Sequence, residues 1–338
     1  MAPEAPAPAA AERVVVDECR GVLFVYSDGA VERKAGPGFA TPVRDDGTVE
    51  WKDATFDAAR GLGVRLYRPR ERAAGGERRG LPVFFYWHGG GFCIGLRTWP
   101  NCQNYCLRLA AELGAVVVAP DYRLAPEHRL PAAFEDAEAA LLWLASQAGP
   151  GGDPWVSEAA DFGRVFVSGD SAGGTIAHHL AVRFGSAAGR AELEPARVVG
   201  YVQLMPFFGG VERTPSEAEC PDDAFLNRPL NDRYWRLSLP AGATADHPFS
   251  NPFGPGSPDL AAAEFVPTLV VVGGRDLLRD RAVDYAARLR AMGKPVEALE
   301  FEGQQHGFFT IDPWSTASGD LMRAVKRFVD TDGGLRLG

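Results

Sequence analysis

Short apolar runs alternate with longer amphipathic stretches along most of this chain. The short runs are typical of strands buried in a sheet and comprise residues 81–87, 115–119, 164–167 and 268–272. Residues 297–301 are more polar and are interpreted as a late strand. Residues 132–145 and 175–182 instead have the spacing of amphipathic helices. With earlier strands at 52–57 and 63–68, this alternation predicts an α/β fold with a mostly parallel central sheet flanked by helices.

A glycine-flanked serine stands between one predicted strand and one predicted helix, in Gly169-Asp170-Ser171-Ala172-Gly173. In that context Gly-x-Ser-x-Gly is the signature of a nucleophile elbow, a sharp turn that lifts a serine hydroxyl out of the sheet. The two glycines permit the strained backbone because they carry no Cβ atom. The alternative is a glycine-rich turn that binds phosphate or only redirects the chain. The flanking elements favour Ser171 as a nucleophile.

Three consecutive glycines follow another buried strand, in His88-Gly89-Gly90-Gly91-Phe92. Consecutive glycines let backbone N–H groups face a ligand oxygen without obstruction by side chains. An enzyme that attacks an acyl carbon needs such donors for the charge that develops on the carbonyl oxygen. A flexible loop is the alternative, which the pairing with the elbow disfavours. We expect His88 to brace this loop by hydrogen bonding rather than to act as a base.

A serine nucleophile requires a base, and the base requires an orienting acid. His306 lies in the loop after a late predicted strand, and Asp276 ends another buried strand. The order Ser171, Asp276, His306 is the order of nucleophile, acid and base in α/β hydrolases. Asp280 competes for the acid role, although an acid in the first turn of a helix often only complements the helix dipole. Asp170 is a weaker candidate because a neighbour of the nucleophile on the elbow points elsewhere.

Composition narrows the class of function. The chain has 338 residues, 46% of them hydrophobic and 23% charged, which is ordinary for a soluble globular protein. A net charge of −9 argues against nucleic acid or an anionic membrane as a partner. No apolar run reaches the 18 residues of a membrane helix. No CxxC pair and no zinc-protease spacing of histidines occurs, so no metal is expected.

The first residues bear on the compartment of the protein. Residues 1–11 are rich in Ala and Pro, with neither a basic and apolar secretory signal nor the Arg and Ser of a transit peptide. This composition predicts a disordered tail. It also predicts a cytoplasmic location, with the nucleus as a second compartment.

Several segments together resemble the hormone-sensitive-lipase-like branch of the α/β hydrolases. They are His88–Phe92, Asp121–His128, Gly169–Gly174, Gly273–Asp280 and His306–Phe308. Within that branch the chain resembles the plant carboxylesterases, the group from which the gibberellin receptor derives. Tyr26–Arg33 is similar to the N-terminal segment of that group, so the resemblance covers almost the whole chain.

The resemblance implies an α/β-hydrolase fold, a Ser-His-Asp triad, no cofactor, and hydrolysis of carboxylic esters. It also implies that the N–H groups of Gly90, Gly91 and Ala172 bind the oxyanion. The related receptor, a catalytically silent hormone-binding protein, lacks the triad histidine, whereas this chain has His306. A decarboxylating or dehydrating relative that reuses the triad is a third alternative. Arg97–Cys102 resembles the subgroup that includes strigolactone-degrading esterases.

Two segments do not fit the alternation of strands and helices, residues 12–48 and residues 206–264. Additions of this kind usually cap the active site of an α/β hydrolase. We therefore expect an N-terminal cap segment at 12–48 and a hydrolase domain at 49–338 that contains the insert. Aromatic residues are expected to line an apolar pocket for a small-molecule ester or lactone, with ordinary core packing as the alternative: Phe92, Trp99, Phe207, Phe225, Trp235 and Phe308.

Charged residues of the segment Asp121–His128 have a structural interpretation. Pro126 stiffens a connection that follows a buried strand. Asp121, Arg123 and Glu127 are expected to form a salt-bridged brace behind the site, which fixes geometry without taking part in the chemistry.

Overall fold

The computed structural model describes residues 13–36, 41–70 and 80–334. The chain divides into two compact units, Met1–Gly38 and Phe39–Gly338. The tail predicted for residues 1–11 lies outside the described residues.

The first unit contains a small antiparallel sheet of three strands in sequence order: β1 (Val15–Cys19), β2 (Leu23–Tyr26) and β3 (Val31–Arg33). The Arg13 guanidinium lies 3.7 Å from the centroid of the Tyr26 ring, and the Tyr26 hydroxyl donates to Glu32 at 2.5 Å. The sequence pattern does not indicate these strands. They occupy the first part of the segment 12–48, whose role as a cap stays a prediction.

The second unit is built on an eight-stranded sheet in the order β11-β10-β9-β8-β6-β7-β5-β4. Its strands are β4 (Val49–Asp57), β5 (Leu62–Pro69), β6 (Leu81–Trp87), β7 (Val116–Pro120), β8 (Ala160–Asp170), β9 (Val198–Leu204), β10 (Thr268–Gly273) and β11 (Val296–Phe301). In the sheet order from β11 to β7 all neighbouring strands are parallel. The other two pairs, β7 with β5 and β5 with β4, are antiparallel. The predicted, mostly parallel sheet is confirmed.

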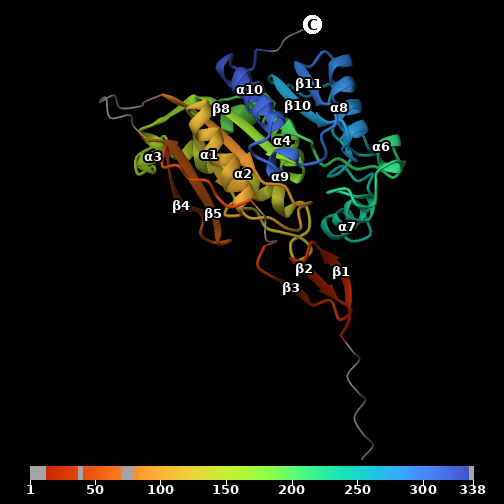
Figure 1. Cartoon of the computed structure of the whole chain (residues 1–338). Helices are drawn as coiled ribbons and strands as arrows, with labels where there is room; N and C mark the ends of the chain where they lie inside the picture. The colour runs from red at the N-terminus through yellow and green to blue at the C-terminus, as the bar shows by residue number, and fades with distance from the viewer. Residues whose placement is uncertain (1–12, 37–40, 71–79, 335–338) are drawn as a thin grey trace, which may run out of the picture. The chain divides into compact units, whose positions relative to one another are not determined.

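Helices cover both faces of this sheet (Figure 1). They are α1 (Pro100–Leu113), α2 (Ala132–Ser146), α3 (Pro154–Ser157), α4 (Ala172–Arg183), α5 (Ala187–Glu192), α6 (Pro215–Ala218), α7 (Arg228–Ser238), α8 (Arg279–Ala291), α9 (Phe308–Ile311) and α10 (Thr316–Asp330). Alternate residues of β10 point to opposite faces: Val271 joins the core under α10, and Val270 joins the core under α8. The α/β-hydrolase fold expected from the sequence is therefore present.

The insert at 206–264 contains the short helices α6 and α7 joined by turns. Hydrogen bonds tie it to the loop between β7 and α2, since Leu130 N donates to Ser238 O at 2.8 Å and the Arg129 guanidinium donates to the Leu239 carbonyl at 2.6 Å. Among the described residues, no helix is both long and apolar enough to cross a membrane.

Candidate active site

Ser171 stands at a sharp turn between β8 and α4. Its backbone has φ 53° and ψ −117°, a conformation that L-residues rarely adopt and that therefore stores strain. Hydrogen bonds hold the turn on both sides: Ser171 N donates to Leu204 O, and Phe207 N donates to Ser171 O, each at 2.9 Å. The predicted strand-turn-helix context of this serine is confirmed.

The glycines beside Ser171 are required by close backbone contacts. A Cβ atom at Gly169 would lie 2.4 Å from the Gly173 backbone, and one at Gly173 would lie 2.0 Å from the Trp87 carbonyl oxygen. Real Cβ atoms do not approach backbone this closely. The Gly-x-Ser-x-Gly pattern therefore follows from the packing of the elbow against itself and against β6.

His306 and Asp276 form a buried hydrogen-bonded pair. His306 Nδ1 lies 2.8 Å from Asp276 Oδ2, and the two residues are 6% and 3% exposed. Asp276 Oδ1 also accepts the N–H of Leu278 at 2.9 Å, so both carboxylate oxygens are engaged. Asp276 follows the carboxyl end of β10 and His306 follows β11, while Ser171 follows β8 at the same edge of the sheet.

Asp280, the competing acid, has other partners. Its carboxylate accepts the N–H of Ser216 at 2.8 Å and pairs with Arg279 at 2.9 Å. Two histidines on α4 are also engaged elsewhere: His178 contacts the Tyr285 hydroxyl at 2.9 Å, and His179 contacts Glu138 at 2.8 Å. Of the candidates weighed from the sequence, Asp276 is therefore the acid that His306 meets.

The glycine loop after β6 is packed so closely that side chains cannot fit. Gly90 has φ 113°, and a Cβ atom there would lie 2.0 Å from the Ile94 carbonyl oxygen. Gly91 has φ 59°, and its Cβ would lie 2.3 Å from the ring of Tyr234 on α7. Ala172 is the first residue of α4, so its N–H has no acceptor within the helix. That these three N–H groups bind an oxyanion stays a prediction.

His88 packs inside the loop that it begins. Its Nδ1 lies 2.8 Å from the Gly89 carbonyl oxygen, and its ring stacks on Tyr122 with centroids 4.4 Å apart. The Tyr122 hydroxyl donates to the His88 carbonyl oxygen at 2.9 Å. A Cβ at Gly95 would lie 2.4 Å from His88 Nδ1, so this ring fills the loop. These contacts agree with a bracing role.

Asp170 links the elbow to the glycine loop, a connection that the sequence analysis does not predict. The Tyr86 hydroxyl donates to Asp170 Oδ1 at 2.6 Å, and a Cβ at Gly89 would lie 2.4 Å from Asp170 Oδ2. Burial raises the pKa of the Asp170 carboxyl, and the hydrogen bond from Tyr86 acts in the opposite direction. Only the position of Tyr86 in the strand before the glycines could have suggested this pairing.

Phe92, Phe207 and Trp235 come together in one buried aromatic cluster. Phe207 stacks on Trp235 with centroids 4.1 Å apart and 7° between the ring planes. The Phe92 centroid lies 6.3 Å from that of Phe207 and 6.0 Å from that of Trp235. Each residue is at most 3% exposed, so much of each ring is covered by its neighbours. Their contact with substrate stays a prediction.

The other predicted pocket residues lie apart from this cluster or at its margin. The Phe225 ring lies 3.6 Å from the position that a Cβ would take at Gly307, beside His306. Phe308 packs on Phe301 with centroids 5.2 Å apart. Trp99 is partly buried and immediately precedes α1. A substrate-binding role for each of them remains a prediction.

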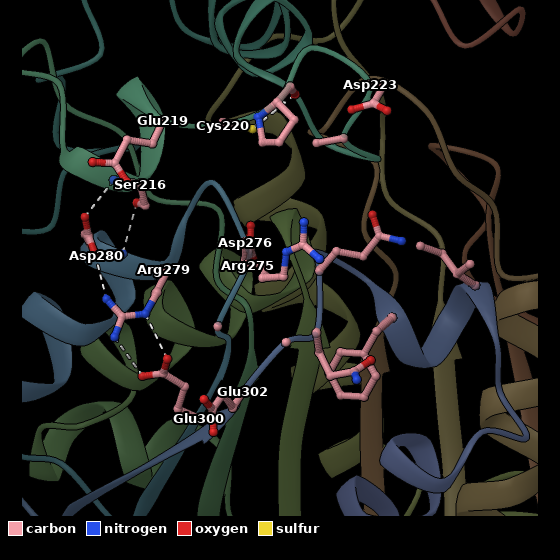
Figure 2. Close-up of a pocket in the computed structure, with 18 of the residues that line it drawn as sticks. Ser216, Glu219, Cys220, Asp223, Arg275, Asp276, Arg279, Asp280, Glu300 and Glu302 are labelled. Carbon is pink, nitrogen blue, oxygen red and sulfur yellow. Dashed lines mark hydrogen bonds and ion pairs between the residues drawn. The ribbon is translucent and has the colours of Figure 1, made fainter.

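A cavity of about 950 Å³ opens beside the acid of the His306–Asp276 pair. Asp276 and Phe308 line it, whereas neither Ser171 nor His306, both within the described part of the chain, is among its lining residues. Figure 2 shows Asp276 and Arg275 on one loop at the centre of this view.

The wall of this cavity is rich in carboxylates. Arg279 lies between two of them, with its guanidinium 2.9 Å from Asp280 and 2.8 Å from Glu300 (Figure 2). The remaining carboxylates besides Asp276 are Glu219, Asp223, Glu302 and Asp312. Such a wall does not suit the apolar acyl chain of an ester, because carboxylates facing it would lose hydration.

Asp121 and Arg123, which were expected to form a brace with Glu127, do not pair with each other. Asp121 instead pairs with Arg97, whose backbone N–H also donates to it at 2.8 Å. Arg123 pairs with the fully buried Asp136 at 2.8 Å. Both ion pairs therefore join the segment to α2 or to the loop before α1. Proximity in sequence was the wrong guide, because these charged side chains pair with residues of other elements.

Comparison with protein families gives a match over most of the second unit. A family model described as alpha/beta hydrolase fold matches residues 84–310. The chain is 36% identical over 323 residues to tuliposide A-converting enzyme 2, chloroplastic, of Tulipa gesneriana, covering 95% of this chain and 79% of that protein. It is 37% identical over 269 residues to probable carboxylesterase 6 of Arabidopsis thaliana, covering 79% and 77%. It is 34% identical over 318 residues to 2-hydroxyisoflavanone dehydratase of Glycyrrhiza echinata, covering 91% and 94%.

Solved structures similar to this chain are esterases. An esterase of Pyrobaculum calidifontis superposes with a TM-score of 0.68 at 30% identity, covering 83% of this chain and 85% of that one. A thermostable carboxylesterase cloned from a metagenomic library gives 0.70 at 29% identity, covering 85% and 90%.

The predicted cytoplasmic location is contradicted by these relatives. The similar tulip enzymes are chloroplastic or amyloplastic by name. The prediction rested on features missing from residues 1–11, and missing features do not identify a compartment. The fold, the family match and the esterase relatives agree on a coarser conclusion. The chain belongs to the α/β-hydrolase fold family, as a serine ester hydrolase of the carboxylesterase kind.

Proposed function

We propose that this protein hydrolyses carboxylic esters with Ser171 as nucleophile, His306 as base and Asp276 as orienting acid. The observation that carries the proposal is the buried hydrogen bond of 2.8 Å between His306 Nδ1 and Asp276 Oδ2. It lies at the sheet edge where Ser171 stands on its strained turn. A histidine held through Nδ1 can present Nε2 to a hydroxyl proton, as the triad mechanism requires.

In the proposed reaction, Ser171 Oγ attacks the ester carbonyl carbon while His306 Nε2 takes the hydroxyl proton. Asp276 fixes the tautomer of His306 and stabilises the imidazolium ion. The proton then passes to the leaving alkoxide, and the alcohol departs from an acyl-enzyme. Water, deprotonated by the same histidine, attacks the acyl-enzyme and releases the carboxylic acid.

The N–H groups of Gly90, Gly91 and Ala172 would bind the oxyanion of each tetrahedral intermediate. The close packing of Gly90 against Ile94 and of Gly91 against Tyr234 supports this role, because it holds the loop in one conformation. Preorganised donors cost no rearrangement at the moment when charge develops.

The proposed substrates are esters of small to medium apolar molecules, with a plant-hormone ester or a strigolactone-like lactone as the finer candidate. The resemblance of Arg97–Cys102 to strigolactone-degrading esterases supports the lactone. Segment 12–48 and the insert would act as caps that supply apolar contacts. Phe92, Trp99, Phe207, Phe225, Trp235 and Phe308 would provide part of those contacts.

Elimination of water is a second candidate reaction, because 2-hydroxyisoflavanone dehydratase is a relative along 91% of this chain. The two reactions differ in product mass. Hydrolysis adds one water to the substrate, whereas dehydration removes one. Mass spectrometry of the products from a 2-hydroxyisoflavanone and from an ester separates them.

The test of the catalytic assignment uses p-nitrophenyl butyrate and matched serine and histidine variants. Ser171→Ala and His306→Ala should each lower kcat by about 10³-fold or more, because the triad acts as a unit. His128→Ala, at an exposed position on a loop, is the matched control and should keep normal turnover. A fluorophosphonate should lose fluoride and add its phosphonyl group to the peptide containing Ser171. Near-normal turnover in folded Ser171→Ala would refute the serine mechanism, and turnover of a strigolactone analogue decides the finer assignment.

A further inference from the structure

A second cavity lies at the opposite edge of the sheet from Ser171. Its volume is about 520 Å³, within the range of small-molecule sites. Val198 at the amino end of β9 and Val266 just before β10 line it, together with Ala181 and Phe184 near the carboxyl end of α4. Ser171 precedes the other end of α4, about 15 Å from Ala181 at the helical rise of 1.5 Å per residue.

The inner wall of this cavity is apolar. Ala181, Phe184, Leu193 and Ala196 are each at most 3% exposed, so the surrounding protein holds them in place. Burying apolar ligand surface against such a wall is favourable.

One polar group faces this apolar wall without a partner. Tyr201 is 3% exposed and lines the cavity, yet its hydroxyl makes no hydrogen bond within the described residues. Gln203, two residues along the same face of β9, does have a partner, since its amide donates to the Tyr285 hydroxyl at 3.2 Å. Burial raises the pKa of Tyr201, so the hydroxyl keeps its proton and remains a donor at neutral pH.

Four charged residues line the cavity, two of each sign: Arg190, Glu194, Arg197 and Glu264. Arg190 and Glu264 form an ion pair at 2.6 Å, with their side chains 44% and 63% exposed. The Arg190 guanidinium also donates to the Gly185 carbonyl oxygen. A charged ligand would have to give up its hydration inside an apolar chamber and break this pair. The cavity therefore favours a neutral molecule.

We propose that this cavity is a second ligand site, separate from the ester site, that binds a neutral ring compound carrying one carbonyl oxygen. The rings pack against Phe184, Leu193 and Val266, and the carbonyl oxygen accepts the hydrogen bond of Tyr201. The site depends on none of the proposed catalytic residues.

Benzophenone, with two rings and one carbonyl group, is the probe, and diphenylmethane is the matched compound without the acceptor. Calorimetric titration of the full chain should give tighter binding of benzophenone. Tyr201→Phe should weaken benzophenone binding about 3- to 10-fold and leave diphenylmethane binding unchanged, because one hydrogen bond is worth about 0.5–1.5 kcal/mol. Near-ultraviolet light, which couples bound benzophenone to neighbouring C–H bonds, should label peptides that contain Phe184, Leu193 or Val266.

Two controls keep the test decisive. Tyr201→Phe should melt at the same temperature as the original protein, because its hydroxyl has no bond to lose, whereas Val266→Trp should fill the cavity and abolish binding. Ser171→Ala should bind benzophenone normally, so failure here is distinct from failure of the esterase assignment. Unchanged affinity in Tyr201→Phe, labelling confined to other peptides, or no binding at the solubility limit would overturn the proposal.

Discussion

The ion pair between Glu217 on α6 and Arg281 on α8 is the interaction whose loss we expect to cost most stability in the insert. Arg281 Nε and Nη2 donate to the two Glu217 carboxylate oxygens at 2.5 and 3.0 Å. The Glu217 side chain is 1% exposed and that of Arg281 12%. Arg281 also donates to the carbonyl oxygens of Gly209, Gly210 and Glu212, so it holds the start of the insert.

Glu217→Gln keeps the size of the side chain and removes its charge. The Arg281 guanidinium would then remain buried without a counter-charge, a change that costs about 3–5 kcal/mol when one partner of a buried pair is lost. Three carbonyl acceptors and one amide oxygen remain, so we expect the lower end, about 3 kcal/mol. That corresponds to roughly a hundredfold change in the folding equilibrium.

The matched control is Asp232→Asn, in the pair between Asp232 and Arg213. Two hydrogen bonds of 2.6 and 2.8 Å join these side chains, but both are more than 40% exposed. Solvent screens such a pair, and its loss should cost about 0–1 kcal/mol. The two variants thus remove the same kind of charge from bidentate pairs at different burial, and the pairs share one longer contact, Arg213 to Glu217 at 3.8 Å.

Urea unfolding, followed by circular dichroism and by tryptophan fluorescence, measures both effects. Coincidence of the two signals tests whether one free energy describes the transition. The m-value should stay constant, so that a change in midpoint reports stability. Equal losses in the two variants, or a loss below about 1 kcal/mol for Glu217→Gln, would refute the argument that burial makes this pair strong.

Three further predictions concern catalysis, pH and the first unit. Asp276→Asn should lower kcat for p-nitrophenyl butyrate clearly more than Asp280→Asn, and the reverse order would reassign the acid. Burial lowers the pKa of His178 to about 3, whereas in the unfolded chain this histidine has its ordinary pKa near 6.5. The free energy of unfolding should therefore be unaffected by His178 above about pH 6.5 and should fall as the pH drops from about 6.5 toward 3, because only the unfolded chain then binds the proton. Because the residue keeps some solvent contact, the slope should stay below about 1.4 kcal/mol per pH unit. Unfolding curves of His178→Gln should be flatter in that window, and an unchanged slope would count against the burial of the ring. Deleting residues 1–38 should reduce kcat/KM for an octanoate ester more than for an acetate ester, because large substrates draw more binding energy from a cap. Equal losses for the two esters would mean that residues 1–38 play no part in substrate selection.

The elbow and the glycine loop could be predicted from sequence because close backbone contacts leave room only for glycine at certain positions. A Cβ atom at Gly173 would meet the Trp87 carbonyl oxygen at 2.0 Å, and one at Gly90 would meet the Ile94 carbonyl oxygen at 2.0 Å. No other residue type fits such positions, so the glycines reveal the geometry. Asp276 was recognisable because it follows a strand with a clear apolar pattern, and His306 because it lies in the loop after the next predicted strand.

Contacts between distant elements could not be predicted in the same way. Asp121 pairs with Arg97 and Arg123 with Asp136, rather than with one another, because the fold brings those partners nearer. Several strands also lacked a clear signal, namely β1, β2, β3 and β9. An aromatic residue in the insert looks the same in sequence whether it stacks in the core or faces a ligand.

The insert begins as part of the elbow, and this explains why its first aromatic residue is buried. Phe207 N donates to the Ser171 carbonyl oxygen at 2.9 Å, and the Phe207 carbonyl oxygen accepts the hydroxyl of Thr175 on α4 at 2.6 Å. Phe207 therefore has one backbone polar group bound to the strained turn and the other to the helix that follows it. Its ring stacks on Trp235 of α7, so the second helix of the insert rests on a residue that the elbow itself holds. A change in the insert that moves Phe207 must accordingly disturb the backbone of Ser171.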